Sequence, residues 1–131
     1  MATPDELERQ HTLSTATTRY DELRMRDALA SMADNDGLPP PSAEETLELL
    51  ALSEVIIRKA GYGRQNTVRS ARRAGASWTQ IGTALGTSKQ AAWEAHNRWI
   101  EDQARQHERT GYQGFDPEQA GAARDLAGRP D

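Results

Sequence analysis

The sequence predicts an all-α protein, because helix-capping patterns recur along the chain and no segment alternates β-branched and polar residues as a strand does. Three segments begin with serine or threonine and have glutamate or glutamine three residues later, at Thr3, Ser42 and Ser77. Each pattern is typical of a capping box, in which both side chains bond to backbone N–H groups at the start of a helix.

The first helix is predicted to begin after Thr3, with Pro4 at its first position, and to run to about Ala33. Its apolar residues fall at helical spacings but are interrupted by threonines and charges, so we expect a helix that depends on a partner. Those apolar residues are Leu13, Ala16, Tyr20, Leu23 and Ala30. Residues 1–36 therefore form an expected acidic N-terminal helical arm.

A Pro-rich linker at 37–42 separates this arm from the most apolar part of the chain. The helix predicted at 43–60 carries more apolar residues than one narrow stripe can hold: Leu47, Leu49, Leu50, Leu52, Val55, Ile56 and Ile57. We expect this helix to be buried around much of its circumference, or to be shared with a second subunit.

Further helices are expected in 64–75, 78–85 and 88–107, and the helix 43–60 is grouped with them in one domain, 43–108. Residues 109–131 are expected to be a C-terminal tail with a short helix at 117–126.

The segment SWTQIGTALGTSKQAAW, residues 77–93, satisfies the packing demands of a helix-turn-helix. Such a motif needs inward apolar or small residues on both helices and a glycine in the turn. The predicted core residues are Ile81, Gly82, Leu85, Gly86, Ala92, Ala95 and Trp99, with Gly82 allowing close approach and Gly86 forming the turn.

The outer face of the second helix predicts contacts with DNA bases. Glutamine can bind adenine with both groups of its amide, lysine can contact guanine and glutamate can accept from cytosine. The expected base-reading residues are Ser88, Lys89, Gln90 and Glu94.

Phosphate contacts are expected from Arg64, Arg69, Arg72, Arg73 and Thr87, although cations such as Arg72 and Arg73 are also favourable at any helix C-terminus. Trp93 either contacts DNA or packs against a neighbouring helix, and packing is favoured.

Charge is divided unevenly along the chain, whose net charge is −4. Residues 1–57 carry 4 basic and 12 acidic side chains, whereas residues 58–105 carry 9 basic and 3 acidic ones. The basic block therefore coincides with the helix-turn-helix pattern, which favours a polyanionic partner over a merely solvated face.

The segment SWTQIGTALGTSKQAAW resembles the helix-turn-helix of small bacterial transcriptional regulators. Within it, SKQAAW is similar to the opening of the recognition helix in biotin-operon-repressor-type domains. The resemblance implies a three-helix core at 65–105 with a recognition helix at 88–98. The sequence departs from it at Thr87, where valine or isoleucine is usual, and at Gly82, where alanine is commoner.

Catalytic and metal-binding patterns are not found. The chain has no cysteine, and we expect His11, His96 and His107 to lie on the surface, too far apart to share a metal ion. No nucleotide-binding loop or nucleophile elbow is present, so no enzyme activity and no cofactor are expected. The polar N-terminus and the absence of a long apolar run favour a cytoplasmic, nucleoid-associated protein without a membrane partner.

The sequence thus predicts a homodimeric, sequence-specific regulator that binds double-stranded DNA. The alternative is a protein-interaction module in which the acidic N-terminal helix binds a protein partner and the helix-turn-helix is a scaffold.

Overall fold

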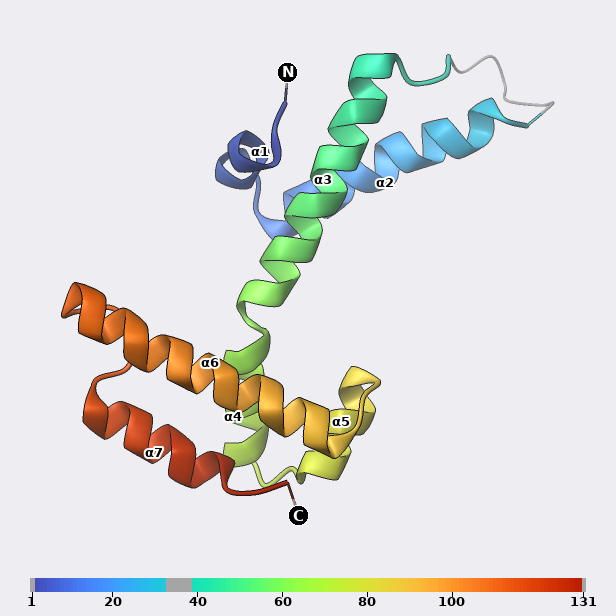
Figure 1. Cartoon of the computed structure of the whole chain (residues 1–131). Helices are drawn as coiled ribbons and strands as arrows, with labels where there is room; N and C mark the ends of the chain where they lie inside the picture. Colours follow the sequence, from blue (N-terminus) through green and yellow to red (C-terminus); the bar gives the residue numbers. More distant parts are fainter. Residues whose placement is uncertain (1, 33–38, 131) are drawn as a thin grey trace. The chain divides into compact units, whose positions relative to one another are not determined.

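The structure is a computed structural model that describes residues 2–32 and 39–130, all of whose regular secondary structure is helical (Figure 1). The prediction of an all-α protein is confirmed. The chain divides into two compact units, Met1–Gly63 and Arg64–Asp131. The first contains α1 (Pro4–Gln10), α2 (Leu13–Ala30) and α3 (Ala43–Tyr62). The second contains α4 (Arg64–Arg73), α5 (Trp78–Leu85), α6 (Lys89–Thr110) and α7 (Pro117–Ala127).

The N-terminal arm is two helices, so the prediction of one continuous helix is wrong. His11 is extended, with φ −117°, and Thr12 caps a new helix. The Thr12 hydroxyl accepts from the Thr15 backbone N–H, and the Thr15 hydroxyl accepts from the Thr12 N–H. These local bonds satisfy the N–H groups that a helix start leaves without partners, and so the chain can restart here.

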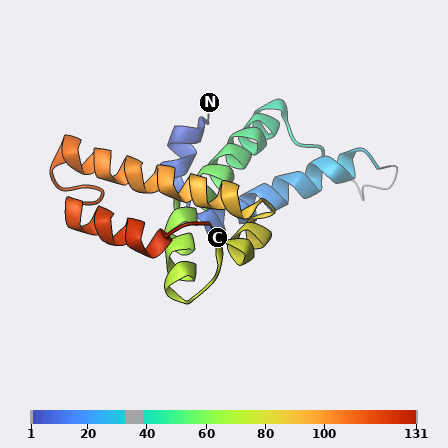
Figure 2. The ribbon, with the colours of Figure 1, turned by 60° about the horizontal axis from the view of Figure 1, so that its bottom comes forward.

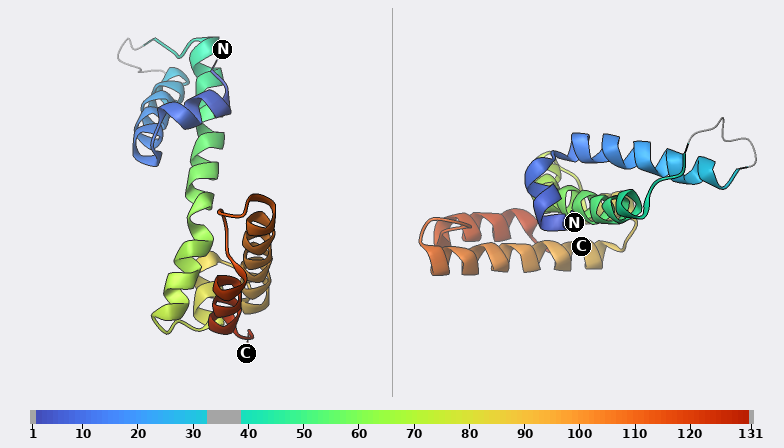
Figure 3. Two further views of the ribbon diagram at one scale, coloured as in Figure 1. Left: turned by 90° about the vertical axis from the view of Figure 1, so that its left-hand side faces the viewer. Right: turned by 90° about the horizontal axis from the view of Figure 1, so that it is seen from above.

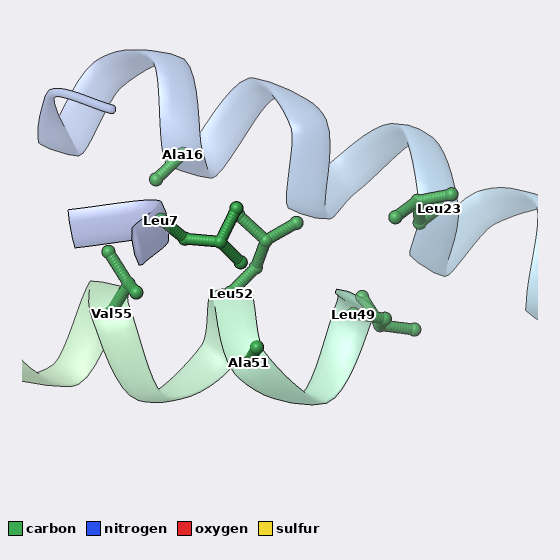
Figure 4. Packing of buried hydrophobic residues seen from close by; sticks show 7 residues of the cluster. All are labelled: Leu7, Ala16, Leu23, Leu49, Ala51, Leu52 and Val55. Carbon is green, nitrogen blue, oxygen red and sulfur yellow. The ribbon is translucent and has the colours of Figure 1, made fainter. Parts of the chain in front are cut away.

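The core of the first unit lies where α1 and α2 pack on one face of α3 (Figure 4). Its buried residues are Leu7, Ala16, Leu23, Leu49, Ala51, Leu52 and Val55. The expectation that α3 is buried around much of its circumference is not met within this unit, since Leu50 is 63% and Ile57 68% exposed. Part of the apolar surface of α3 is thus open to solvent.

Ion pairs align α2 with α3. Arg19 donates two hydrogen bonds to Glu48, at 2.9 and 3.1 Å, and Arg26 donates two to Glu45, at 2.7 and 3.2 Å. Glu45 also accepts from the Ser42 N–H in the capping box of α3. The bonds from Arg26 and Ser42 lower the pKa of Glu45 to about 2. One carboxylate therefore starts α3 and holds α2 against it.

The division of the chain differs from the expected one. The segment 43–63 packs with α1 and α2 and belongs to the first unit, not to a domain spanning 43–108. Of the expected linker at 37–42, residues 37 and 38 lie outside the described residues, as do residues 33–36 of the expected arm. Ser42 is the N-cap of α3.

The second unit has α6 and α7 side by side and antiparallel, with α4 and α5 packed against them (Figures 2 and 3). Its buried core contains Val68, Trp78, Ile81, Ala92, Ile100, Ala123 and Ala127. Residues 109–131 were expected to be a tail, but α7 supplies Ala123 and Ala127 to this core. The C-terminal segment is therefore an integral part of the unit.

A tight turn between α6 and α7 reverses the chain. Gly114 has φ +73°, and a Cβ atom there would lie 2.1 Å from the backbone oxygen of Gln103. The adjacent Phe115 N–H donates to that same oxygen at 3.0 Å. Only glycine fits this approach, and the turn fixes Phe115 against the core.

A second tight turn joins α5 to α6. Gly86 has φ 72° and caps α5 in the left-handed conformation, and the Thr87 N–H donates to Gly82 O at 2.8 Å. A Cβ atom on Gly82 would lie 2.8 Å from Thr87 O and 2.9 Å from the Ser88 carbonyl carbon. The absence of a side chain at position 82 therefore sets how closely the turn approaches α5.

Among the described residues, no helix is long and apolar enough to cross a membrane.

We predict that Gly82→Ala lowers the free energy of unfolding of the second unit by about 1–3 kcal/mol, because backbone atoms must move to admit the methyl group. Urea unfolding followed by tryptophan fluorescence measures this, since Trp78, Trp93 and Trp99 all lie in that unit. The matched control is Gly121→Ala in α7, where an added Cβ meets nothing within 4 Å. It should be neutral or stabilising by up to about 1 kcal/mol. Equal effects of the two variants would contradict the close approach at Gly82.

Candidate nucleic-acid interface

The N-terminus of α6 presents a cluster of exposed polar residues: Thr87, Ser88, Lys89, Gln90 and Glu94. Ser88 is the N-cap, and its hydroxyl accepts from the Ala91 N–H at 3.0 Å. The remaining N–H groups of the first turn point along the helix axis and, with the helix dipole, favour an anion there. The structure therefore places all four residues predicted to read bases, together with Thr87, on one accessible end of α6.

Gln90 and Glu94 are bonded to each other, one helical turn apart. The Gln90 amide nitrogen donates to a Glu94 carboxylate oxygen at 2.9 Å. The amide has a second N–H and an acceptor oxygen, which are the two groups that bind an adenine edge. The bond to Glu94 therefore orients the Gln90 amide while leaving its base-binding groups available.

Arg98 extends the same face and was missed from the sequence. It is exposed, four residues after Glu94 and eight after Gln90, and forms no ion pair among the described residues. Residues four apart lie on one side of a helix. This spacing is the signal by which Arg98 could have been recognised.

Two of the four arginines expected to contact phosphate are occupied by the fold. Arg72 donates to Leu126 O and to Ala76 O, and its guanidinium carbon lies 5.2 Å from the centre of the Trp78 ring. Arg69 is half-buried against Trp99 and Phe115. Arg64 and Arg73 are exposed. For Arg72, the sequence left open whether the cation contacts phosphate or stabilises a helix C-terminus. The structure fits the second interpretation, because Arg72 bonds to carbonyls near the ends of helices.

Trp93 packs against the core, as the favoured interpretation has it. It is half-buried, and its indole N–H donates to Gly128 O at 2.7 Å. Trp78, which is fully buried, donates to Ala127 O at 2.7 Å. Two neighbouring carbonyls at the end of α7 thereby anchor α5 and α6.

The residues predicted to form the core behind this face differ in burial. Ile81, Gly82 and Ala92 are buried, and Ala95 and Trp99 are half-buried. Leu85 is 39% exposed, contrary to its assignment as an inward residue. It is the last residue of α5, directly before the turn at Gly86, so no following turn of helix covers it.

His96 is buried, so the prediction that it lies on the surface is wrong. Its ring lies between Trp78 and Trp99, with centroids 5.6 and 5.3 Å away, and its Nδ1 is hydrogen-bonded to Gln65 Oε1 at 2.8 Å. Burial, and secondarily the charges of Arg69 and Arg72, lower the pKa of His96 to about 4. His96 falls four residues after Ala92 and four before Ile100, a buried stripe that the helical spacing could have revealed.

The second unit has a nearly balanced charge. Residues 64–131 carry ten basic and eight acidic side chains, a net charge of +2. Several charges pair within the unit, including Arg124 with Glu101 and Arg105 with Asp102. On the exposed face from Ser88 to Arg98, the positive charges are Lys89 and Arg98, and Glu94 offsets one of them. In the described part of the chain no group of three or more acidic or histidine side chains is arranged to hold a metal ion.

The first unit has its own exposed feature, a shallow apolar groove between α2 and α3. One part, of about 300 Å³, is lined by Tyr20, Ile56 and Ile57 among others, and a second part, of about 250 Å³, includes Leu50. Tyr20 and Ser53 line both parts, so the groove is continuous. We refer to it as the α2/α3 groove.

Comparisons with known proteins do not assign the chain to a family: no family model, no curated protein and no solved structure matches it.

We predict that the second unit loses stability as the pH falls through the window between 6.5 and about 4. The pKa of His96 is depressed in the folded chain, so the unfolded chain binds the proton first and gains from acidification. The loss between about pH 7 and about pH 5 should be about 2 kcal/mol in the free energy of unfolding, followed by tryptophan fluorescence in urea.

The variant His96→Phe cannot titrate at this position and should flatten this pH dependence, even though it leaves Gln65 without its partner. His107→Phe, a replacement outside the buried core, should leave the pH dependence in place. An undiminished slope in His96→Phe would refute the assignment.

Proposed function

We propose that the protein is a sequence-specific regulator that binds double-stranded DNA as a homodimer, with α5 and α6 acting as a helix-turn-helix and the first two turns of α6 as the base-reading segment. The observation that carries the proposal is the exposed polar cluster at the start of α6, behind which the close turn at Gly82 and Gly86 braces the helix. The resemblance of residues 77–99 to small bacterial regulators points the same way.

The dimensions and chemistry of this end of α6 suit the major groove. The groove is about 12 Å wide, and a helix with its side chains has a diameter of about 10–12 Å. Gln90, oriented by Glu94, would bind adenine, and Ser88 and Lys89 would contact bases beside it. Glu94 would act chiefly by holding Gln90, since its carboxylate is engaged there.

Phosphate contacts are assigned to Thr87 and to exposed cations of the second unit. Lys89 lies at the helix N-terminus and Arg98 two turns further on, and Thr87 precedes the cap. Arg64 is exposed at the start of α4. Each phosphate neutralised would release counterions and increase the salt dependence of binding.

The homodimer is proposed to form through the first unit. Leu50 and Ile57 are exposed apolar residues that line the α2/α3 groove, and this groove can receive a helix from a second copy. A two-fold dimer uses the same surface on both copies and would present two base-reading segments about 34 Å apart.

A second candidate function is supported by the same groove together with the charge of the first unit. Residues 1–63 carry 6 basic and 12 acidic side chains, a net charge of −6. A basic, apolar segment of another protein would complement this surface. In that case the first unit is a protein-interaction module and the second its scaffold.

We predict that the full-length protein binds mixed-sequence duplex DNA with an affinity that falls steeply as salt increases, measured by fluorescence anisotropy. Lys89→Ala and Arg98→Ala should each weaken binding to every duplex and reduce the slope of log affinity against log salt by about 0.9. Arg109→Ala, which removes an exposed arginine from the opposite end of α6, is the matched control and should change neither quantity. Absence of binding at low salt would refute the DNA-binding proposal.

Once a preferred duplex has been selected, Gln90→Ala should reduce discrimination against its altered sites by about 1–3 kcal/mol while leaving the salt slope unchanged. Unaltered selectivity would remove Gln90 from the base-reading set without affecting the phosphate contacts.

We also predict that the protein sediments as a dimer at micromolar concentration, and that Leu50→Glu and Ile57→Glu shift it to monomer, because each places a charge in the apolar lining of the α2/α3 groove. Met32→Glu is the control, because Met32 is exposed but does not line the groove. A monomeric wild type would contradict the homodimer and favour the protein-interaction alternative.

A further inference from the structure

A cavity of about 450 Å³ lies between α4 and α7 in the second unit. Its lining combines two arginines with apolar residues: Arg69, Arg73, Phe115, Ala122, Ala123 and Leu126. Gly114 and Gln119 complete it, and no residue of α5 or α6 takes part. The volume falls in the range of small-molecule sites, which are mostly apolar with a few convergent polar groups.

The two arginines have positive charge that no carboxylate balances. Neither forms an ion pair among the described residues, and no aspartate or glutamate lines the cavity. The Arg69 Nε atom is buried and has no hydrogen-bond partner among the described residues, while the same side chain donates one long bond, of 3.5 Å, to Asn66 Oδ1. Burial, and then the charge of Arg73, lower the pKa of Arg69. An anion placed between Arg69 and Arg73 would offer the unpaired Nε an acceptor, and its negative charge would stabilise the two guanidinium groups.

The apolar part of the cavity is held in shape by the turn at Gly114. Phe115 packs edge-on against Trp99, with centroids 5.3 Å apart, and its backbone is bonded to Gln103. Ala122, Ala123 and Leu126 form the α7 wall. Small side chains at 122 and 123 leave room for a ring or a short hydrocarbon chain.

We propose that this cavity binds a small organic anion, with a carboxylate or phosphate head between Arg69 and Arg73 and an aromatic or alicyclic body against Phe115 and the α7 alanines. Arginine suits such a head group because its N–H groups match two oxygens at once.

The position of the cavity gives such a ligand a route to α5 and α6, and this regulatory consequence rests on the proposed function. The Leu126 backbone oxygen accepts from Arg72, and the next two carbonyls hold Trp78 and Trp93. A ligand that displaces the end of α7 therefore acts directly on the bonds that position the proposed DNA-reading helices.

Isothermal titration calorimetry of the full-length protein tests the site, with 2-naphthoate and 1-naphthyl phosphate as probes and 2-naphthamide as the neutral analogue. We expect saturable binding of at least one anion, and binding of the amide weaker by about tenfold or more. The preferred anion distinguishes a carboxylate site from a phosphate site. Since no DNA is present, the outcome is independent of whether the protein binds DNA.

Three variants assign the binding to this cavity. Arg73→Gln removes an exposed charge and should weaken the preferred anion by about tenfold or more. Arg64→Gln removes an equivalent charge from the same helix outside the cavity and should have no effect. Ala122→Leu fills the cavity while keeping both arginines and should abolish binding. Failure of both anions to saturate, equal binding of the amide, or indifference to Arg73→Gln or to Ala122→Leu would each overturn the proposal.

Discussion

The second unit depends on two indole hydrogen bonds that end on neighbouring carbonyls. Trp78 in α5 donates to Ala127 O, and Trp93 in α6 donates to Gly128 O, both at 2.7 Å. The Trp78 indole is buried, and a buried N–H without a partner is costly, so its bond fixes where α7 can end relative to α5, while the exposed Trp93 bond adds a link to α6. These two bonds also explain why the C-terminal segment is part of the core. Without it, the Trp78 indole N–H would lose Ala127 O as its acceptor, and the alanines of α7 would lose their packing partners.

Local sequence signals predicted the helices and the α5–α6 turn well, because caps and turns are determined by residues a few positions apart. The capping boxes at Ser42 and Ser77 are present, and Gly86 adopts the left-handed conformation. The break at Thr12 was missed, since its partner is a threonine rather than the glutamate or glutamine of the usual box.

Contacts between distant residues could not be predicted in the same way. Trp78 and Ala127 are 49 positions apart, and Arg72 and Leu126 are 54 apart, so no local pattern pairs them. For the candidate site, the exposed face at Ser88 to Glu94 followed from helical spacing, whereas the burial of His96 and the engagement of Arg72 depended on which helices cover α6. The basic block at 58–105 also overstated the positive charge around the candidate site. It contains Arg58, which pairs with Asp5 and Glu8 in the first unit. Acidic residues after position 105 reduce the net charge of the second unit.

The bond between Gln90 and Glu94 has a consequence for how a base preference could change. Because one side chain holds the other, the two positions are energetically coupled, and the effect of replacing both would differ from the sum of the single effects. Under the proposed function, a substitution at Gln90 leaves Glu94 with an unpaired acceptor facing the negatively charged groove, while a substitution at Glu94 frees the Gln90 amide to rotate. A shift to a new target sequence would therefore pass through less selective single variants and be completed only by a matched pair.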